Sequence, residues 1–331
     1  MKYIVTGGAG FIGSHIVDAL IKDGHKVLII DSLVTGKKEN INPKAEFHKV
    51  DIINENDIEP LFKGVDGVFH TAALARIQPS FENPDSYFKA NAVGTRNVLM
   101  CAKKHGVKRV VYSASSSAYG TTALPTVEDV RISSQSLHPY GSTKRMGEML
   151  MSDLGIMTGG PETVCLRYFN VYGPRQTTEA DGAYPTVIGL FLGLLKKKKP
   201  LTIVPDGHQR RDFTWVGDVV NANISAMKSK KVGKAEIINI GSGENYSIWD
   251  VARLILDVSK KTTEKAARRG EPRSKISERE LIKSGKCIMA PQRRGEVRET
   301  LADISKAKKL LGWEPKMKFE KGIKELLKMQ S

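Results

Sequence analysis

A glycine-rich segment near the start of the chain constrains the fold more than any other feature. The sequence Thr-Gly-Gly-Ala-Gly-Phe-Ile-Gly-Ser-His occupies positions 6–15 and follows a short β-branched run at 3–6. Gly7, Gly10 and Gly13 are each separated by two residues, and a helical pattern begins at the last of them. Small residues at such a turn let the backbone approach a pyrophosphate, and the free N–H groups of the helix start attract the anion. The segment therefore predicts a dinucleotide-binding strand–turn–helix unit.

An acidic residue supports this interpretation and indicates which dinucleotide binds. A second predicted strand, 26–31, ends in Asp31, which lies 18 positions after Gly13. A carboxylate there accepts hydrogen bonds from the adenosine ribose and repels a 2′-phosphate. We therefore expect NAD as the cofactor, and the nearby Lys37 and Lys38 leave NADP as the alternative.

Short β-branched runs alternate with helical patterns through the first 115 residues. This alternation predicts an α/β fold with a doubly wound parallel Rossmann sheet and a smaller mixed α/β substrate-binding region. We expect a dinucleotide-binding Rossmann domain over 1–169, with later additions from about 213–240, and a substrate-binding domain over 170–212 and 241–331. The expected strands are 3–6, 26–31, 46–49, 67–70, 109–113, 164–167 and 236–240, and the expected helices are 13–22, 55–62, 87–105 and 141–154.

Composition excludes several classes of protein. The longest apolar run, 187–195, has nine residues, whereas a membrane-spanning helix needs roughly 20. The three cysteines, Cys101, Cys165 and Cys287, form no Cys-x-x-Cys pair, so we expect neither disulfides nor a metal site. Together with the absence of a signal peptide pattern, this favours the reducing cytosol.

The chain is strongly basic, with 52 Lys and Arg against 36 Asp and Glu and a net charge of +16. Such a field attracts nucleic acid, acidic membranes or phosphorylated small molecules. The lysine run 196–199 and the basic segment 259–286 lack adjacent aromatic stacking motifs, so we interpret the segment as a solvated helix and loop. We therefore expect neither nucleic acid nor membrane as the primary partner.

A tyrosine and a lysine are placed four residues apart at a predicted helix start. Tyr140 and Lys144 follow Pro139, so both side chains should lie on one face of the helix. A positive charge ~4 Å from a phenol, at an effective dielectric of ~20, is worth ~4 kcal/mol, or roughly three pKa units. We therefore expect Tyr140 to act as a general base. A serine cluster within 112–120 ends a predicted strand at the edge where open α/β sheets bind ligands.

These residues together resemble the extended short-chain dehydrogenase/reductase superfamily, specifically its nucleotide-sugar epimerase branch. The resemblance runs through nearly the whole chain. It is carried by the segments 6–15, 70–73, 112–120, 167–175, 210–213 and 293–297, and by Asp31, Asn91, Tyr140 and Lys144.

The resemblance implies an isomerase, an NAD-dependent UDP-hexose 4-epimerase, with Ser115, Tyr140 and Lys144 as the catalytic set. In this reaction the tyrosine takes the proton of the 4-hydroxyl while C4 passes hydride to NAD. A 4-keto sugar forms, stays tethered by its diphosphate and receives the hydride on its other face. The cofactor should therefore be retained by the protein.

The resemblance also assigns binding roles, and it implies no metal. Arg211 and Arg293 would clamp the UDP diphosphate, with Arg294 as an alternative to Arg293, and Glu296 would accept a hydrogen bond from the uridine ribose. Asp51 and Ile52 would lie by the adenine. The implied cofactor contacts are Gly7, Gly10, Phe11, Ile12, Gly13, Asp31, Ser32, Asp51, Ile52, Ala72, Ala73, Asn91, Ser113, Tyr140, Lys144 and Tyr168. The implied substrate contacts are Ser115, Ser116, Asn170, Val187, Arg211, Arg293, Glu296 and Thr300.

Several alternatives within the superfamily remain open. Sugar dehydratases and decarboxylating relatives usually carry acid–base groups where this chain has Ser116 and Ser117, which counts against both activities. The small Thr300 leaves room for an N-acetylated sugar, so UDP-N-acetylhexosamines join UDP-glucose and UDP-galactose as expected substrates. UDP-glucuronate 4-epimerase and a nucleotide-sugar dehydrogenase or reductase are the other hypotheses. The helices 87–105 and 141–154 resemble the pair that forms dimers in this superfamily, so we expect a homodimer.

Overall fold

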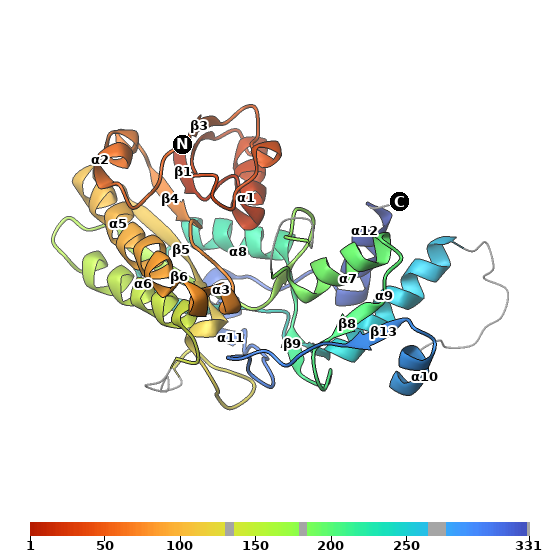
Figure 1. Ribbon diagram of the computed structural model, residues 1–331. Helices are drawn as coiled ribbons and strands as arrows, with labels where there is room; N and C mark the ends of the chain where they lie inside the picture. Colours follow the sequence, from red (N-terminus) through yellow and green to blue (C-terminus); the bar gives the residue numbers. More distant parts are fainter. Residues whose placement is uncertain (130–135, 179–183, 264–275, 330–331) are drawn as a thin grey trace.

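Seven parallel strands form the central sheet of the molecule (Figure 1). Across the sheet they are β3 (Glu46–His48), β2 (Lys26–Ile30), β1 (Lys2–Thr6), β4 (Gly67–His70), β5 (Arg109–Ser115), β6 (Glu162–Tyr168) and β11 (Lys234–Ile240). The computed structural model describes residues 1–129, 136–178, 184–263 and 276–329. The strand order reverses between β1 and β4, which creates a crevice at their carboxyl ends where open α/β sheets bind ligands.

The predicted doubly wound sheet is confirmed, and each predicted strand is present. Two strands begin two residues earlier than predicted, β6 at Glu162 and β11 at Lys234. Both residues are charged and exposed at the strand start, so a search for apolar runs stops short of them.

Successive side chains of the strands supply two separate cores. Tyr3 and Val5 of β1 pack on one face of the sheet, whereas Ile4 between them packs on the other. This alternation, with both faces covered, is what a parallel sheet requires. The helices α1 (Phe11–Lys22) and α8 (Val216–Lys228) cover the first face, and α5 (Gly94–Lys104) and α6 (Pro139–Gly155) cover the second.

Two predicted helices are interrupted. The stretch 87–105 contains the end of α4 (Pro84–Phe88), a π-helical turn (Lys89–Val93) and α5, and therefore is not one continuous helix. Such turns occur often at functional sites, and this one contains Asn91. The stretch 55–62 divides into α2 (Glu55–Ile58) and a 3₁₀ turn (Glu59–Phe62) that has a proline in its first turn.

A third core lies beyond the sheet, among the elements at the right of Figure 1. It includes Phe191 of α7, Trp249 and Ile255 of α9, and Ile323 of α12. A separate core supports the proposed division into two domains. The elements here are α7 (Val187–Lys196), β8 (Leu201–Ile203), α9 (Ile248–Thr263), α10 (Glu278–Lys283), β13 (Cys287–Met289) and α12 (Phe319–Lys328).

Short strand pairs join this region to the sheet. β7 (Val171–Tyr172) pairs with β10 (Thr214–Trp215), and β9 (Arg210–Asp212) pairs with β12 (Asn245–Ser247). The remaining helices are α3 (Ile77–Glu82) and α11 (Ser305–Leu311). Within the basic segment 259–286, α9 and α10 account for the ends, and 264–275 lie outside the described residues. None of the helices in the described ranges has the length and apolar content needed to cross a bilayer.

Candidate active site

The glycine-rich turn after β1 has no room for side chains. Gly7 has a φ of +70°, and a Cβ there would lie 2.7 Å from the backbone nitrogen of Ala72. A Cβ on Gly13 would lie 2.2 Å from the Gly7 carbonyl oxygen. Gly10 precedes α1 and offers its first turn no side-chain acceptor. Unoccupied N–H groups in a close backbone cradle fit the pyrophosphate of a dinucleotide.

Asp31 is buried at the carboxyl end of β2, next to this turn. Its carboxylate accepts hydrogen bonds from the backbone nitrogens of Ala9 (3.0 Å) and Leu33 (2.8 Å). Burial raises the pKa of the Asp31 carboxyl, and these two hydrogen bonds oppose the rise. The rigid carboxylate fits the ribose hydroxyls that distinguish NAD.

The other predicted cofactor residues follow the same sheet edge. Asp51 comes after β3 and accepts a hydrogen bond from the Ile53 nitrogen at 3.1 Å, while Ile52 is buried in the core. Ala72, after β4, donates its backbone N–H to Thr6. Contacts with the cofactor at Ser32, Asp51, Ile52, Ala72 and Ala73 stay predictions.

Lys144 lies buried between α6 and β5. Its Nζ donates to the Ser113 carbonyl oxygen at 2.8 Å and stands 4.8 Å from the centroid of the Tyr112 ring. Burial lowers the pKa of the Lys144 ammonium to about 7, against the opposing effect of the Glu148 charge. The Ser113 hydroxyl pairs with the Tyr168 hydroxyl at 3.0 Å, so both are engaged within the sheet.

The Tyr140 phenol is in a different electrostatic state from the one that its spacing to Lys144 predicts. Burial raises the pKa of the phenol above its ordinary value, while a hydrogen bond with Ser115 and the positive charge of Arg76 oppose the rise. The predicted lowering of this pKa by Lys144 is not found among the protein groups that act on the phenol. The Lys144 side chain extends to the Ser113 carbonyl oxygen, and the cation that lowers the pKa of the phenol is Arg76.

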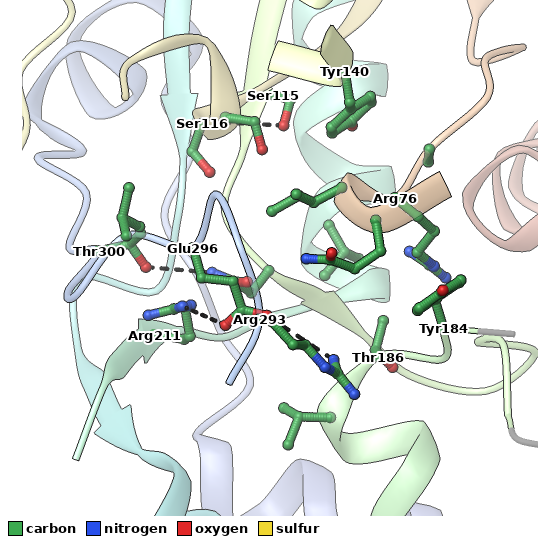
Figure 2. A pocket seen from close by; sticks show the side chains of 18 of the residues that line it. Arg76, Ser115, Ser116, Tyr140, Tyr184, Thr186, Arg211, Arg293, Glu296 and Thr300 are labelled. Atoms are coloured by element: carbon green, nitrogen blue, oxygen red, sulfur yellow. Dashed lines mark hydrogen bonds and ion pairs between the residues drawn. The ribbon is translucent and has the colours of Figure 1, made fainter. Parts of the chain in front are cut away.

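A pocket of about 380 Å³ opens beside the Tyr140 phenol (Figure 2). It gathers residues from the sheet, from the β7–α7 region and from the segment near 293–300. All the predicted substrate residues line it, together with three of the predicted cofactor residues besides Tyr140. These are Ser115, Ser116, Asn170, Val187, Arg211, Arg293, Glu296 and Thr300, and Phe11, Ile12 and Tyr168.

Two arginines share one carboxylate at the far side of this pocket. Glu296 lies 3.3 Å from the Arg211 guanidinium and 3.9 Å from that of Arg293 (Figure 2). Asn170 donates to the Thr300 hydroxyl at 3.3 Å, and that hydroxyl also accepts from the Asp212 nitrogen. The two guanidinium groups of Arg211 and Arg293 carry one positive charge more than Glu296 neutralises, and this excess charge suits a diphosphate group.

Asn91, which is predicted to contact the cofactor, forms hydrogen bonds with protein groups. Its side-chain oxygen accepts from the Leu74 nitrogen at 2.8 Å, and its nitrogen donates to the Leu74 oxygen (2.9 Å) and the Thr143 hydroxyl (3.0 Å). The amide therefore holds the loop after β4 against α6.

Sequence reasoning missed two residues of this pocket, Arg76 and His138. His138 caps α6 by accepting from the Gly141 nitrogen, and its ring stacks on that of Tyr140 at 6.0 Å between centroids. Arg76 carries one usable signal: it is a cation six residues after the end of β4, a strand whose carboxyl end meets the crevice.

Comparisons with known proteins show which family the chain is similar to. The family model described as NAD dependent epimerase/dehydratase family matches residues 3–241. A putative UDP-glucose 4-epimerase of Methanocaldococcus jannaschii is 38% identical over 98% of this chain and 96% of its own length.

Solved structures are similar over the full length as well. The UDP-glucose 4-epimerase of Thermotoga maritima, with UDP-glucose, has a TM-score of 0.85 at 33% identity and covers 99% of this chain and 98% of its own. The UDP-glucuronic acid 4-epimerase of Bacillus cereus, with UDP-glucuronic acid and NAD, has a TM-score of 0.83 at 32% identity and covers all of both chains. The cofactor is NAD, as the glycine turn and Asp31 predict. The chain belongs to the NAD-dependent epimerase/dehydratase family, within the UDP-sugar 4-epimerases of the extended short-chain dehydrogenase/reductase superfamily.

Proposed function

We propose that this chain inverts C4 of a UDP-linked hexose, interconverting UDP-glucose and UDP-galactose and accepting the UDP-N-acetylhexosamine pair. The observation that carries the proposal is one pocket with a half-buried tyrosine at one end and two arginines at the other. Tyr140 and its hydrogen-bonded neighbour Ser115 lie at the first end, and Arg211 and Arg293 lie around Glu296 at the second. That arrangement suits a sugar bound through C4 on one side and a diphosphate on C1 on the other.

Each of these residues has a separate task. The positive nicotinamide ring of bound NAD would oppose the rise that burial gives to the pKa of Tyr140 and would favour its phenolate form. Tyr140 would then take the proton of the 4-hydroxyl and later return it to the product. Ser115 donates a hydrogen bond to the sugar oxygen as that proton leaves. Arg211 and Arg293 hold the diphosphate, so that the sugar stays attached to the site while it rotates to present its other face. Bound NAD supplies a hydride acceptor and donor for C4.

The residues beside Ser115 argue against a lyase activity. Ser116 and Ser117 also line the pocket, and neither hydroxyl titrates near neutral pH. Dehydration or decarboxylation that needs a further acid or base at these positions therefore has no group to use. Inversion at C4 requires only the one base that Tyr140 provides.

Product analysis by NMR tests the proposal most simply. The purified protein is incubated, without added NAD, with a large excess of UDP-glucose, UDP-N-acetylglucosamine, UDP-glucuronate or UDP-xylose. We expect one or more of them to reach a mixture of its two C4 epimers, far beyond one turnover per protein. A nucleotide-sugar dehydrogenase would instead stop after one equivalent and accumulate reduced cofactor, and that result would contradict the proposal.

A further inference from the structure

Arg76 lies on the pocket wall near the Tyr140 phenol, in the loop between β4 and α3 (Figure 2). Its guanidinium donates to the hydroxyl of Thr177, which is neutral. Among the described residues, no carboxylate lies within ion-pair distance of it, whereas Arg211 and Arg293 share Glu296. Arg76 therefore brings a positive charge to the pocket that the described residues leave uncompensated.

The backbone at Arg76 is strained, and its surroundings hold it in place. Its φ is +116°, a strained value for a residue with a side chain, and such strained residues cluster at functional sites. The loop before it is fixed by the two hydrogen bonds between Asn91 and Leu74, and by the Tyr87 hydroxyl, which donates to the Ala75 oxygen at 3.2 Å. These hydrogen bonds therefore hold Arg76 at a fixed place on the pocket wall before a ligand binds.

The position of this charge relative to the base indicates which part of a sugar it faces. Arg76 and Tyr140 line the same pocket. Tyr87 lies between their elements: its hydroxyl donates to the Ala75 oxygen, and its ring centroid is 6.2 Å from that of Tyr140. In a pyranose, the ring neighbours of C4 are C3, which carries a neutral hydroxyl, and C5, which carries C6, whereas the diphosphate is attached to C1 across the ring. Of the substituents next to C4, only the one at C6 can carry a negative charge, as the carboxylate of a hexuronic acid, so it is the one that a cation near the base would match.

We propose that Arg76 binds the C6 carboxylate of a UDP-linked hexuronic acid and makes hexuronates the preferred substrates of this pocket. A guanidinium forms two parallel, charge-assisted hydrogen bonds with a carboxylate. The C6 hydroxymethyl group of a neutral hexose would leave the half-buried guanidinium without a counter-charge, which is unfavourable. The proposal rests on the proposed inversion at C4, and it ranks UDP-linked hexuronic acids above the neutral UDP-hexoses named there.

The test compares initial rates with UDP-glucuronate and UDP-glucose in wild type and in Arg76→Met. A hydrogen bond to a charged group corresponds to about a tenfold effect or more, so we expect wild type to favour UDP-glucuronate in kcat/KM by at least that factor. In Arg76→Met this ratio should fall at least about tenfold, and Arg76→Lys should retain part of it. Arg279→Met, which removes the same charge from an exposed position on α10, should leave the ratio unchanged.

Arg76→Gly is a second variant, because glycine adopts the backbone conformation at this position without strain. It removes the guanidinium and should fold at least as stably as wild type. An unchanged ratio of the two kcat/KM values in the folded variant would overturn the role of Arg76. Equal or faster conversion of UDP-glucose by wild type would overturn the preference, while the proposed function would stand.

If no UDP-sugar is epimerised, the proposed function is contradicted, but the carboxylate site is not. Binding measured by calorimetry then tests the carboxylate site separately. Tighter binding of UDP-glucuronate than of UDP-glucose, lost in Arg76→Gly, would still support carboxylate recognition by Arg76. Equal binding of the two nucleotide sugars would overturn it.

Discussion

Lys144 is a buried cation whose charge is costly in the folded chain. Burial lowers its pKa to about 7, whereas an unfolded lysine titrates near ~10.4. Below about pH 7 the full penalty of the buried ammonium is present in the folded state. Between these two values the unfolded chain binds more protons than the folded one, so the free energy of unfolding rises with pH.

Lys144→Met should remove this pH dependence. We expect the free energy of unfolding of wild type to increase by about 2 kcal/mol more than that of the variant between about pH 7 and about pH 9. Urea denaturation at the two pH values measures both increases. Lys321→Met, at an exposed position of α12, is the matched control and should behave as wild type. Equal increases in the free energy of unfolding of wild type and Lys144→Met would contradict the lowered pKa of Lys144.

For single residues, the sequence predicts which side chains carry the chemistry better than it predicts which groups those side chains contact. Tyr140, Ser115 and the Arg211–Arg293 pair carry recognisable motifs, and the structure brings all four to one pocket. Residue spacing does not give the direction in which a long side chain extends, so the hydrogen bond from Lys144 to the Ser113 carbonyl oxygen could not be predicted. Arg76 belongs to no such motif, and its place depends on the path of a loop with an unusual φ.

The strand–turn–helix element at 2–22 depends on close approach between backbone segments. The two ends of its turn meet where Gly13 lies against the Gly7 carbonyl, and a side chain there would push them apart. Gly10, by contrast, has an ordinary φ of −81°, and an added Cβ would approach the same carbonyl only to 3.1 Å. The two glycines therefore differ in how much the element needs them.

Gly13→Ala should lower the amount of NAD that copurifies with the protein. Forcing a methyl group into this space costs about 1–3 kcal/mol, which corresponds to a loss of affinity of roughly tenfold or more. Gly10→Ala is the graded control and should lose less. Extraction of the purified proteins and quantification of NAD by chromatography measures both effects. Full NAD content in Gly13→Ala would contradict the role given to this turn.

Elements with strong periodicity could be predicted from the sequence, whereas their interruptions could not. The seven sheet strands are short apolar runs between helical patterns, and each was located within two residues at its start. The π-helical turn Lys89–Val93 preserves the helical pattern of its surroundings and therefore gives no separate signal. It nevertheless contains Asn91, the residue that holds the loop of Arg76 in place.

At the scale of the whole molecule, the site forms where the crevice of the sheet meets the third core. Strand β5 contributes Ser115, helix α6 contributes Tyr140, and the region beyond the sheet contributes Arg211 and the segment 293–300. Alternating strands and helices predict the sheet because its topology follows general rules. The second region is assembled from strand pairs of two or three residues, and no comparable rule predicts how they meet.

The most direct test of the account is the rate of C4 inversion by Tyr140→Phe, measured by NMR without added NAD. UDP-glucose and UDP-glucuronate are both used as substrates, and the NAD content of each preparation is measured first. Wild type should bring at least one of them to a mixture of its C4 epimers, and Tyr140→Phe, with the same NAD content, should be slower by about a hundredfold or more. Inversion by Tyr140→Phe at the wild-type rate would contradict the account.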